Sequence, residues 1–237
     1  MGIARTGVGC GGREGASGTG NFMIGETPRL RNSVRDILAP ELRKDGFRGS
    51  GNNYYREINE FVQIINLQKS KWGHRFAINL GLHPLCILMS DGSALIAKKI
   101  KEYHCVFRMR LREDKLDTWF EYDETQSSMD NAVKDALNMY HQVGRELLNE
   151  VVLPTSQLNT VTLKSFEEGN YNFQGFGNTK IITAWALARM KEHSGDYQGA
   201  LRFANFVIRS IGDGMGGRGI LPEIKQFVSE TSNLVSN

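Results

Sequence analysis

Residues 103–112, with the sequence YHCVFRMRLR, alternate apolar and polar side chains. This period of two is typical of a β-strand that is buried on one face only. The predicted buried face carries Tyr103, Cys105, Phe107, Met109 and Leu111. The opposite face carries His104, Val106, Arg108, Arg110 and Arg112. The chain is therefore expected to build a sheet that packs one face on a core and presents three arginines in a row on the other.

The composition is that of an ordinary globular protein. Of the 237 residues, 40% are apolar, which suffices for one large domain or for a domain with an extension. The net charge of +3 by itself indicates neither a nucleic-acid-binding nor a membrane-binding protein. We see no run of about 18 apolar residues and no apolar signal segment at the N-terminus, so we expect no membrane contact.

The three cysteines, Cys10, Cys86 and Cys105, match neither a disulfide framework nor a CxxC pair, and we therefore predict a cytoplasmic protein. His83 with Cys86 and His104 with Cys105 would offer four zinc ligands, but HxxC and HC are not the spacings of zinc sites. The sequence has no motif for a catalytic serine, a zinc protease or a phosphate-binding loop. We expect no metal and no cofactor.

The distribution of glycine suggests how the chain is divided. Nine of the 26 glycines lie in residues 1–25 among few core-forming residues, so we predict a disordered tail over residues 1–26. An α+β domain is predicted over residues 27–154, and a helical C-terminal extension over residues 155–237. The extension is expected to pack on the domain as an appendage.

The local patterns predict the elements of an α+β fold. A helix is expected from Thr27, as N-cap, to its end at Asp45 and Gly46, with a kink or break at Pro40. Besides the arginine strand, the predicted strands are 54–56, 61–68 and 75–82. Further predicted helices are 94–101, 130–152, 179–193, 196–211 and 222–235. We expect a mainly antiparallel sheet of about five strands, packed against the N-terminal helix and the long helix at 130–152.

The segment after the arginine strand, DTWFEYD at residues 117–123, is predicted to return in a hairpin with residues 113–116 as its loop. In this register the numbers of opposite residues sum to 229, and the apolar faces coincide. On the polar face the expected pairs are Arg112 with Asp117, Arg108 with Glu121, and Arg110 with Trp119. A face that is neutralised by its own carboxylates favours a structural role over phosphate binding.

Two places on the predicted sheet offer binding residues. The first is the arginine strand, where a guanidinium is expected over an indole. The second is the turn near residue 70, whose basic and aromatic side chains suit stacking on nucleic acid and equally suit a solvated loop. The ligand-binding candidates are Arg110, Trp119, Arg108, Lys69, Trp72 and His74. We identify no catalytic residue.

Residues 46–83, GFRGSGNNYYREINEFVQIINLQKSKWGHRFAINLGLH, combine a GF pair, an aromatic strand, a Q-K-S strand end and an F-x-x-N-L-G strand. These positions are Gly46, Phe47, Tyr54, Gln68, Lys69, Ser70, Phe76, Asn79, Leu80 and Gly81. A later R-x-R and a tryptophan strand supply Arg108, Arg110 and Trp119. In these features residues 28–153 resemble a bacterial family of domains of unknown function, DUF4304. The resemblance implies a fold and no activity.

Three classes of function are compatible with these patterns. We expect first a non-catalytic binding or regulatory module, of immunity or defence type, whose partner is another protein. The alternative is binding of RNA or single-stranded nucleic acid through the basic sheet face, which predicts a salt-dependent affinity. A weaker alternative is a hydrolase of a phosphorylated small molecule, with Arg108 and Arg110 on the phosphate, which requires a deep cleft.

Overall fold

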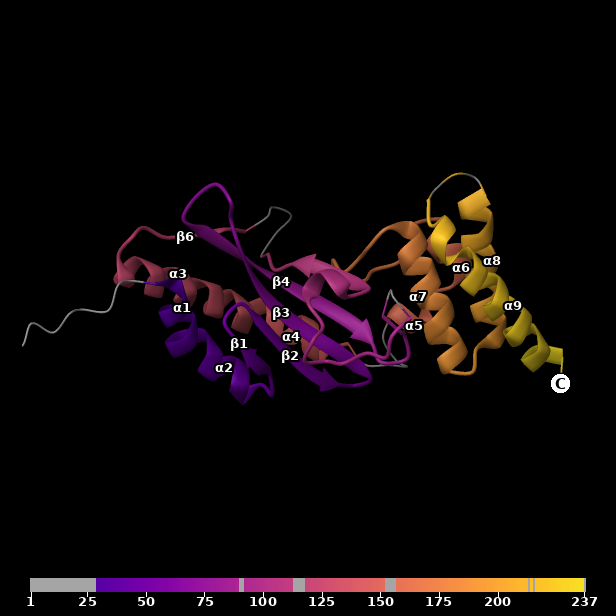
Figure 1. The fold of residues 1–237 in the computed structure, drawn as a ribbon, viewed down its shortest axis with the longest axis horizontal. Coiled ribbons are helices and arrows are strands. Elements are labelled where there is room, and N and C mark those ends of the chain that lie inside the picture. The colour runs from indigo at the N-terminus through magenta and orange to yellow at the C-terminus, as the bar shows by residue number, and fades with distance from the viewer. Residues whose placement is uncertain are drawn as a thin grey trace, which may run out of the picture.

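The computed structural model describes residues 29–89, 92–112, 118–151, 157–212, 214 and 216–236. The expected tail at residues 1–26 lies outside these ranges, and so does Thr27. Within them, the sheet and helices α1 to α4 occupy one end of an elongated molecule, and helices α6 to α9 occupy the other (Figure 1). Both ends contribute to one connected cluster of buried hydrophobic side chains.

The sheet is antiparallel throughout and contains six strands, which confirms the predicted fold class. Strands β1 to β5 follow one another in space in chain order, while β6 pairs with β4. The strands are β1 (Arg48–Ser50), β2 (Asn53–Ile58), β3 (Phe61–Lys69), β4 (Arg75–Pro84), β5 (Phe107–Arg110) and β6 (Phe120–Glu121). The long pair of β3 and β4 forms its centre, as expected from their near-continuous apolar runs.

The predicted hairpin of the arginine strand is wrong. Strand β5 pairs with β4, with Arg110 opposite Asn79, and β6 pairs with the earlier part of the same strand, with Phe120 opposite Phe76. Both therefore lie in line along one edge of β4, and the chain leaves the sheet between them. Alternation assigned the faces of the two segments but could not identify their neighbour, because β4 offers the same apolar and polar faces as a hairpin partner would.

The arginine strand is also shorter than predicted. Residues Glu102–His104 form a 3-10 turn, η2, and the regular strand begins only at Phe107. Cys105 is buried on the sheet face opposite to the side chain of Phe107, although strict alternation placed both on one face. The short helix expected at 94–101 is absent, since this segment forms a single turn at 97–99 and is otherwise irregular.

Two long helices cover one face of the sheet, and each contains a π-helical turn. The first comprises α1 (Leu30–Ser33), η1 (Val34–Leu38) and α2 (Ala39–Lys44), and the second comprises α3 (Gln126–Met139), η3 (Tyr140–Gly144) and α4 (Arg145–Asn149). The first helix does not break at Pro40, because the preceding turn is wound more widely and Ala39 donates to the carbonyl of Val34. A wider turn accommodates the proline ring and its missing N–H group.

The C-terminal helices form as predicted to within two residues. Helix α7 (Lys180–His193) and helix α8 (Tyr197–Gly212) are joined by a tight turn, and α9 (Leu221–Ser236) packs on α8 after a short turn, η4 (Arg218–Ile220). The Thr179 hydroxyl caps α7 by accepting a hydrogen bond from the Ile182 N–H. Two further short helices, α5 (Gln157–Thr160) and α6 (Leu163–Glu167), precede α7.

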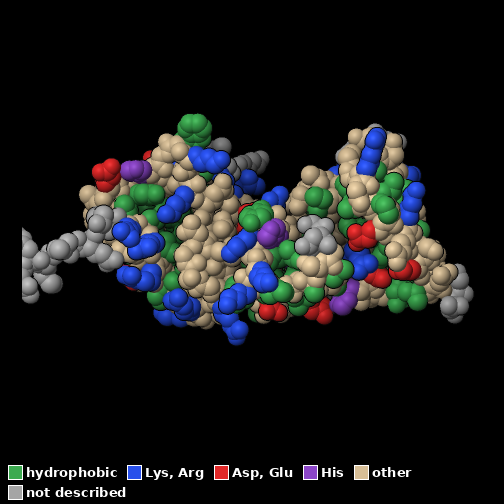
Figure 2. Space-filling view, in the orientation of Figure 1, with side chains coloured by type: hydrophobic (Ala, Val, Ile, Leu, Met, Phe, Trp, Pro, Cys, Tyr) green, Lys and Arg blue, Asp and Glu red, His purple; other side chains and the backbone are tan. Residues whose placement is uncertain are grey.

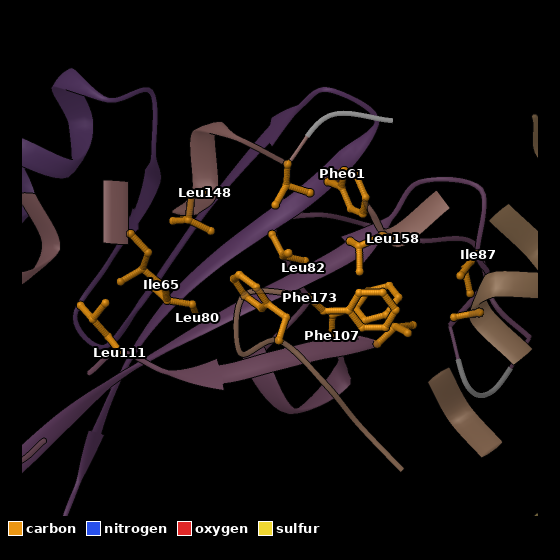
Figure 3. Close-up of a cluster of buried hydrophobic side chains, with 14 of the residues drawn as sticks. Phe61, Ile65, Leu80, Leu82, Ile87, Phe107, Leu111, Leu148, Leu158 and Phe173 are labelled. Carbon is orange, nitrogen blue, oxygen red and sulfur yellow. The ribbon is translucent and has the colours of Figure 1, made fainter. Parts of the chain in front are cut away.

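The main core fills the space between the sheet and the helices (Figure 3). Alternate residues of the strands point into it, among them Ile65, Leu80 and Phe107, and they meet Leu148 of α4 and Leu158 of α5. A smaller cluster lies on the opposite face of the sheet and consists of Val62, Ile64, Ala97, Ile100 and Cys105. The chain between β4 and β5 covers this opposite face over one half only, and the other half is open.

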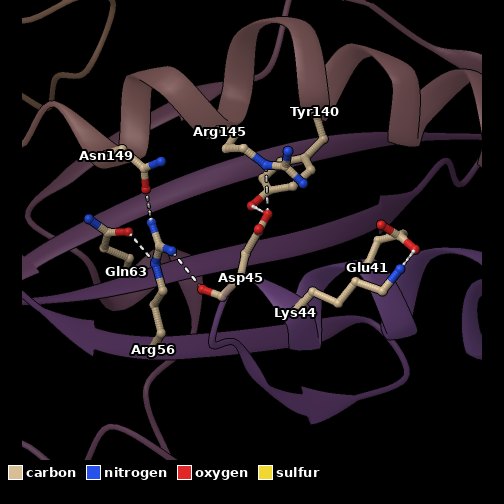
Figure 4. A network of polar contacts seen from close by, with 8 residues as sticks. All are labelled: Glu41, Lys44, Asp45, Arg56, Gln63, Tyr140, Arg145 and Asn149. Carbon is tan, nitrogen blue, oxygen red and sulfur yellow. Dashed lines mark hydrogen bonds and ion pairs between the residues drawn. The ribbon is translucent and has the colours of Figure 1, made fainter.

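A polar network fixes the second helix to the sheet (Figure 4). The buried guanidinium of Arg56 donates to the Gln63 side chain, to the Asp45 carbonyl and to the Asn149 side chain at 2.7–2.8 Å. The Asp45 carboxylate in turn accepts hydrogen bonds from Tyr140 and Arg145 at 2.7 and 2.8 Å. Burial raises the pKa of Tyr140 and the hydrogen bond to Asp45 raises it further, so this hydroxyl stays a donor. All six residues of this network hold the second helix against the sheet.

Candidate functional site

The open half of the sheet face contains a hollow of about 690 Å3. Its floor comes from neighbouring strands, and one wall comes from η2. The lining residues are Asn66, Gln68, Asn79, Glu102, Tyr103, Arg108, Met109, Arg110 and Gly177. Amides, two arginines and one carboxylate thus replace the apolar side chains that fill the other half. We refer to this feature as the hollow.

Three side chains form the hydrogen-bonded floor of the hollow. The Gln68 side-chain carbonyl accepts from the Asn79 amide at 2.9 Å and from the Arg110 guanidinium at 3.0 Å. Arg110 also donates through Nε to the side-chain oxygen Oδ1 of Asn79 at 3.3 Å. These residues meet because strands β3, β4 and β5 are neighbours and all three side chains point to the same face of the sheet. The floor is therefore rigid and holds one face of the guanidinium group in place.

Trp119 lies between two arginines at the edge of the hollow. The guanidinium carbon of Arg110 is 4.6 Å from the indole centroid, and that of Arg75 is 4.9 Å from it. The predicted contact of Arg110 with Trp119 is thus confirmed, although the two residues are brought together by β4 and not by a hairpin. Because both guanidinium groups lie over the ring, Trp119 orients them and is not itself a platform for a stacked base.

Arg108 has a different partner from the one predicted. Its Nη1 atom lies 3.9 Å from the Glu102 carboxylate, whereas Glu121 lies 3.8 Å from Arg75. The backbone of Arg108 exchanges two hydrogen bonds with Gly177, which fixes the strand edge to the C-terminal part of the chain. The predicted partner of Arg112, Asp117, is outside the described residues.

Glu102 is the acidic residue of the hollow, and the sequence patterns did not single it out. Burial raises the pKa of its carboxyl, while the charges of Arg108 and Arg110 act in the opposite direction. Its side chain is 16% exposed. Glu102 and Gly177 were missed because they come from irregular segments. The polar residues Asn66, Gln68 and Asn79, which interrupt otherwise apolar strands, were a signal for this site.

The second predicted patch divides between the two faces of the sheet. Lys69 has the parity of Leu67, a main-core residue, and therefore lies on the helix side of the sheet. The His74 ring stacks on Tyr122, 5.7 Å between centroids. Trp72 is at the tip of the turn between β3 and β4, where 90% of its surface is exposed. Only Arg108, Arg110 and Trp119 of the six predicted candidates therefore gather at the hollow.

His83 and Cys105 lie beside the covered half of this sheet face, whereas Cys86 packs against the main core. Burial lowers the pKa of His83, whose Nε2 lies 3.1 Å from the Ile87 carbonyl oxygen. Burial raises the pKa of the Cys86 thiol to about 11 and also raises that of Cys105. Across the described residues, no three His, Cys, Asp or Glu side chains are close enough together to hold a metal ion. These groups are therefore packing residues.

Five of the positions on which the family resemblance rests, Gln68, Asn79, Arg108, Arg110 and Trp119, lie in the hollow or beside it, whereas others such as Phe76 and Leu80 are in the main core. Residues 38–150 match the family model described as "Domain of unknown function (DUF4304)". This segment is therefore similar to the DUF4304 family of domains. The match begins at Leu38, the last residue of η1, and includes α2, the sheet and the whole second helix from α3 to α4. It ends before the C-terminal helices.

Two further comparisons complete this finding. Neither the search of curated proteins nor the search of solved structures found a match to the chain. Among the described helices, none combines the length and the apolar character that a membrane crossing requires.

Proposed function

We propose that this protein is a non-catalytic binding module whose ligand is a single-stranded nucleic acid. The observation that carries the proposal is the orientation of Arg75 and Arg110 over Trp119 beside an amide-rich hollow. Arginine side chains that are oriented in this way bind phosphate oxygens at a low cost in side-chain entropy. Amide side chains supply both donors and acceptors for the edges of unpaired bases.

The charge distribution supports an anionic ligand. At the sheet end of the molecule, Lys and Arg side chains dominate the face in view, and Asp and Glu are mostly at its margins and over the helical end (Figure 2). The net charge of +3 is small, so the argument depends on this distribution and not on the total. Trp72, at the tip of the neighbouring turn, adds an exposed aromatic surface on which a base can stack.

The shape of the site favours a polymer over a small substrate. The hollow is open to solvent, and its described lining contains no serine, cysteine or histidine that could act as a nucleophile or base. A hydrolase of a small phosphorylated molecule would need an enclosed cleft that excludes water. We therefore propose binding without turnover, and a cytoplasmic location, consistent with the free thiols of Cys86 and Cys105.

Fluorescence anisotropy with a labelled single-stranded RNA tests this proposal. We expect binding at about 50 mM salt that weakens steeply towards about 200 mM, and weaker binding to the matched duplex. Arg110→Ala should lower the affinity, because it removes a held guanidinium group. Arg202→Ala, which removes an exposed arginine from α8, is the matched control and should have little effect. No binding at low salt, or equal losses in both variants, would refute the proposal.

A protein partner is the second candidate, and a specific observation favours it. The chain that covers half of the sheet face exposes the large apolar side chains of Leu85, Leu88 and Ile96, by 42%, 53% and 50%. Exposed apolar residues of this kind mark protein contact sites when they are contiguous. A regulatory module, of immunity or defence type, would bind its partner there. Substitution of Leu88 and Ile96 by serine would then abolish complex formation and leave RNA binding unchanged.

A further inference from the structure

Arg108 has hydrogen-bonding capacity that its surroundings do not use. Its Nε atom is buried and has no hydrogen-bond partner among the described residues. Its Nη1 atom is 3.9 Å from Glu102, a distance of charge attraction that is too long for a hydrogen bond. A buried N–H group without an acceptor is costly, and such groups in folded proteins call for an explanation. A ligand or water in the hollow would supply the acceptor.

Glu102 has the complementary shortage. Its carboxylate accepts no hydrogen bond from the described residues, although its side chain is mostly buried and lines the hollow. Because Glu102 lines the hollow, a ligand there can donate to its oxygens, and Arg108 is too distant to form a hydrogen bond with them. The hollow thus offers, side by side, a group that needs an acceptor and a group that needs donors.

Resting on the proposed function, we infer that the hollow reads one unpaired guanine base of the bound strand through Glu102 and Arg108. The pairing edge of guanine carries an acceptor, O6, followed by two donors, N1–H and the exocyclic amino group. The Arg108 guanidinium donates to O6, and the two oxygens of Glu102 accept from the two donors. Uracil has no exocyclic amino group and would leave the Glu102 carboxylate unsatisfied.

Tyr103 is placed to hold such a base. It follows Glu102 in the η2 turn, lines the hollow and is 66% exposed. The His104 ring packs edge-on against it, with 4.2 Å between the ring centroids, which restrains the phenol ring. Base stacking on an aromatic ring contributes to affinity without regard to sequence. Tyr103 therefore binds the base, and Glu102 with Arg108 identifies it.

Binding of a labelled oligouridine, with the central residue replaced by guanosine or inosine, tests the inference on the unchanged protein. Inosine keeps O6 and N1–H and lacks only the exocyclic amino group. We expect guanosine to bind roughly 5- to 100-fold more tightly than uridine at this position, with inosine between them. Equal affinities for the three oligonucleotides would overturn the inference and leave the proposed function standing. Absence of any binding at low salt would refute both.

The variant Glu102→Gln distinguishes a site that reads guanine from a site that binds only phosphate. If Glu102 reads guanine, the substitution abolishes the guanosine preference and leaves the affinity for plain oligouridine nearly unchanged. If the hollow binds only phosphate, loss of the negative charge strengthens binding of every oligonucleotide alike, and the inference fails. Tyr103→Phe should retain binding, and Tyr103→Ala should weaken it for all sequences. Thermal unfolding of each variant establishes that the fold is intact.

Discussion

The two faces of the sheet are made by the same strands, and yet only one of them is closed. On the helix side, alternate residues such as Leu80 and Phe107 form a continuous apolar core. On the other side, an apolar half under the chain that connects β4 and β5 adjoins a polar half around Asn79 and Arg110. The comparison teaches that alternation predicts a buried face well, whereas the role of the second face depends on what covers it.

The largest effect is expected from a change on the closed face. Phe107 is fully buried, and Phe107→Ala should lower the free energy of unfolding by about 3–5 kcal/mol, because it removes packing and leaves a cavity. Chemical denaturation measures this loss. Tyr103→Ala on the open face is the matched aromatic control. A loss in the free energy of unfolding below about 1 kcal/mol for Phe107→Ala would mean that the two faces do not differ as described.

A smaller effect is expected at Gly81, on the covered half of the second face. A Cβ atom there would lie 2.7 Å from the Cys105 sulfur, so Gly81→Ala should destabilise the fold by about 1–3 kcal/mol. Adding Cys105→Ala removes the sulfur and should recover part of the loss. A double-mutant cycle by chemical denaturation measures the coupling, and strict additivity would contradict the close contact.

On the open face, binding should change more than stability. Trp119→Ala removes two cation–π contacts, each worth about 0.5–1 kcal/mol when exposed. We expect a comparably small loss in the free energy of unfolding and a clear loss of RNA affinity, because Arg75 and Arg110 lose their orientation. Unfolding and anisotropy measurements on one sample compare the two. A variant that loses stability but keeps its affinity would assign Trp119 to packing alone.

The smallest effect concerns the charge of Glu102. Its pKa is raised by burial, against the influence of Arg108 and Arg110 on β5, so protonation favours the folded state. The resulting stability is present below the carboxyl's unfolded pKa and is lost as the pH rises through its folded pKa. Glu102→Gln should therefore be slightly more stable than the wild type at neutral pH. Thermal unfolding across pH should show this difference vanish in acid; a difference independent of pH would contradict it.

Much of the fold followed from local patterns, because periodicity reflects burial directly. Strands β3 and β4 and helices α7 and α8 lie close to their predicted bounds for this reason. The neighbour of β5 was not predictable, since pairing with β4 or with β6 buries the same side chains. The π turn before Pro40 and the position of Cys105 depend on tertiary packing, which no local pattern encodes.

The candidate site could be predicted only in part. The contact of Arg110 with Trp119 was predicted because alternation assigned both side chains to the polar face of the sheet. That assignment holds even though the predicted strand partner was wrong. Glu102 and Gly177 line the hollow from segments outside the regular strands. These segments have no hydrophobic periodicity from which the two residues could be predicted. The polar residues in apolar strands, Gln68 and Asn79, are the signal that would have located the hollow without a structure.

The division of the sheet edge into β5 and β6 also bears on how this fold can diversify. Each piece is registered on β4 by its own backbone hydrogen bonds, so the sheet does not fix the length of chain that joins them. That joint begins just after Arg110 and ends at Trp119, at the rim of the hollow. Insertions there would leave both registers in place, so the length of this joint is free to vary between related proteins without disturbing the sheet.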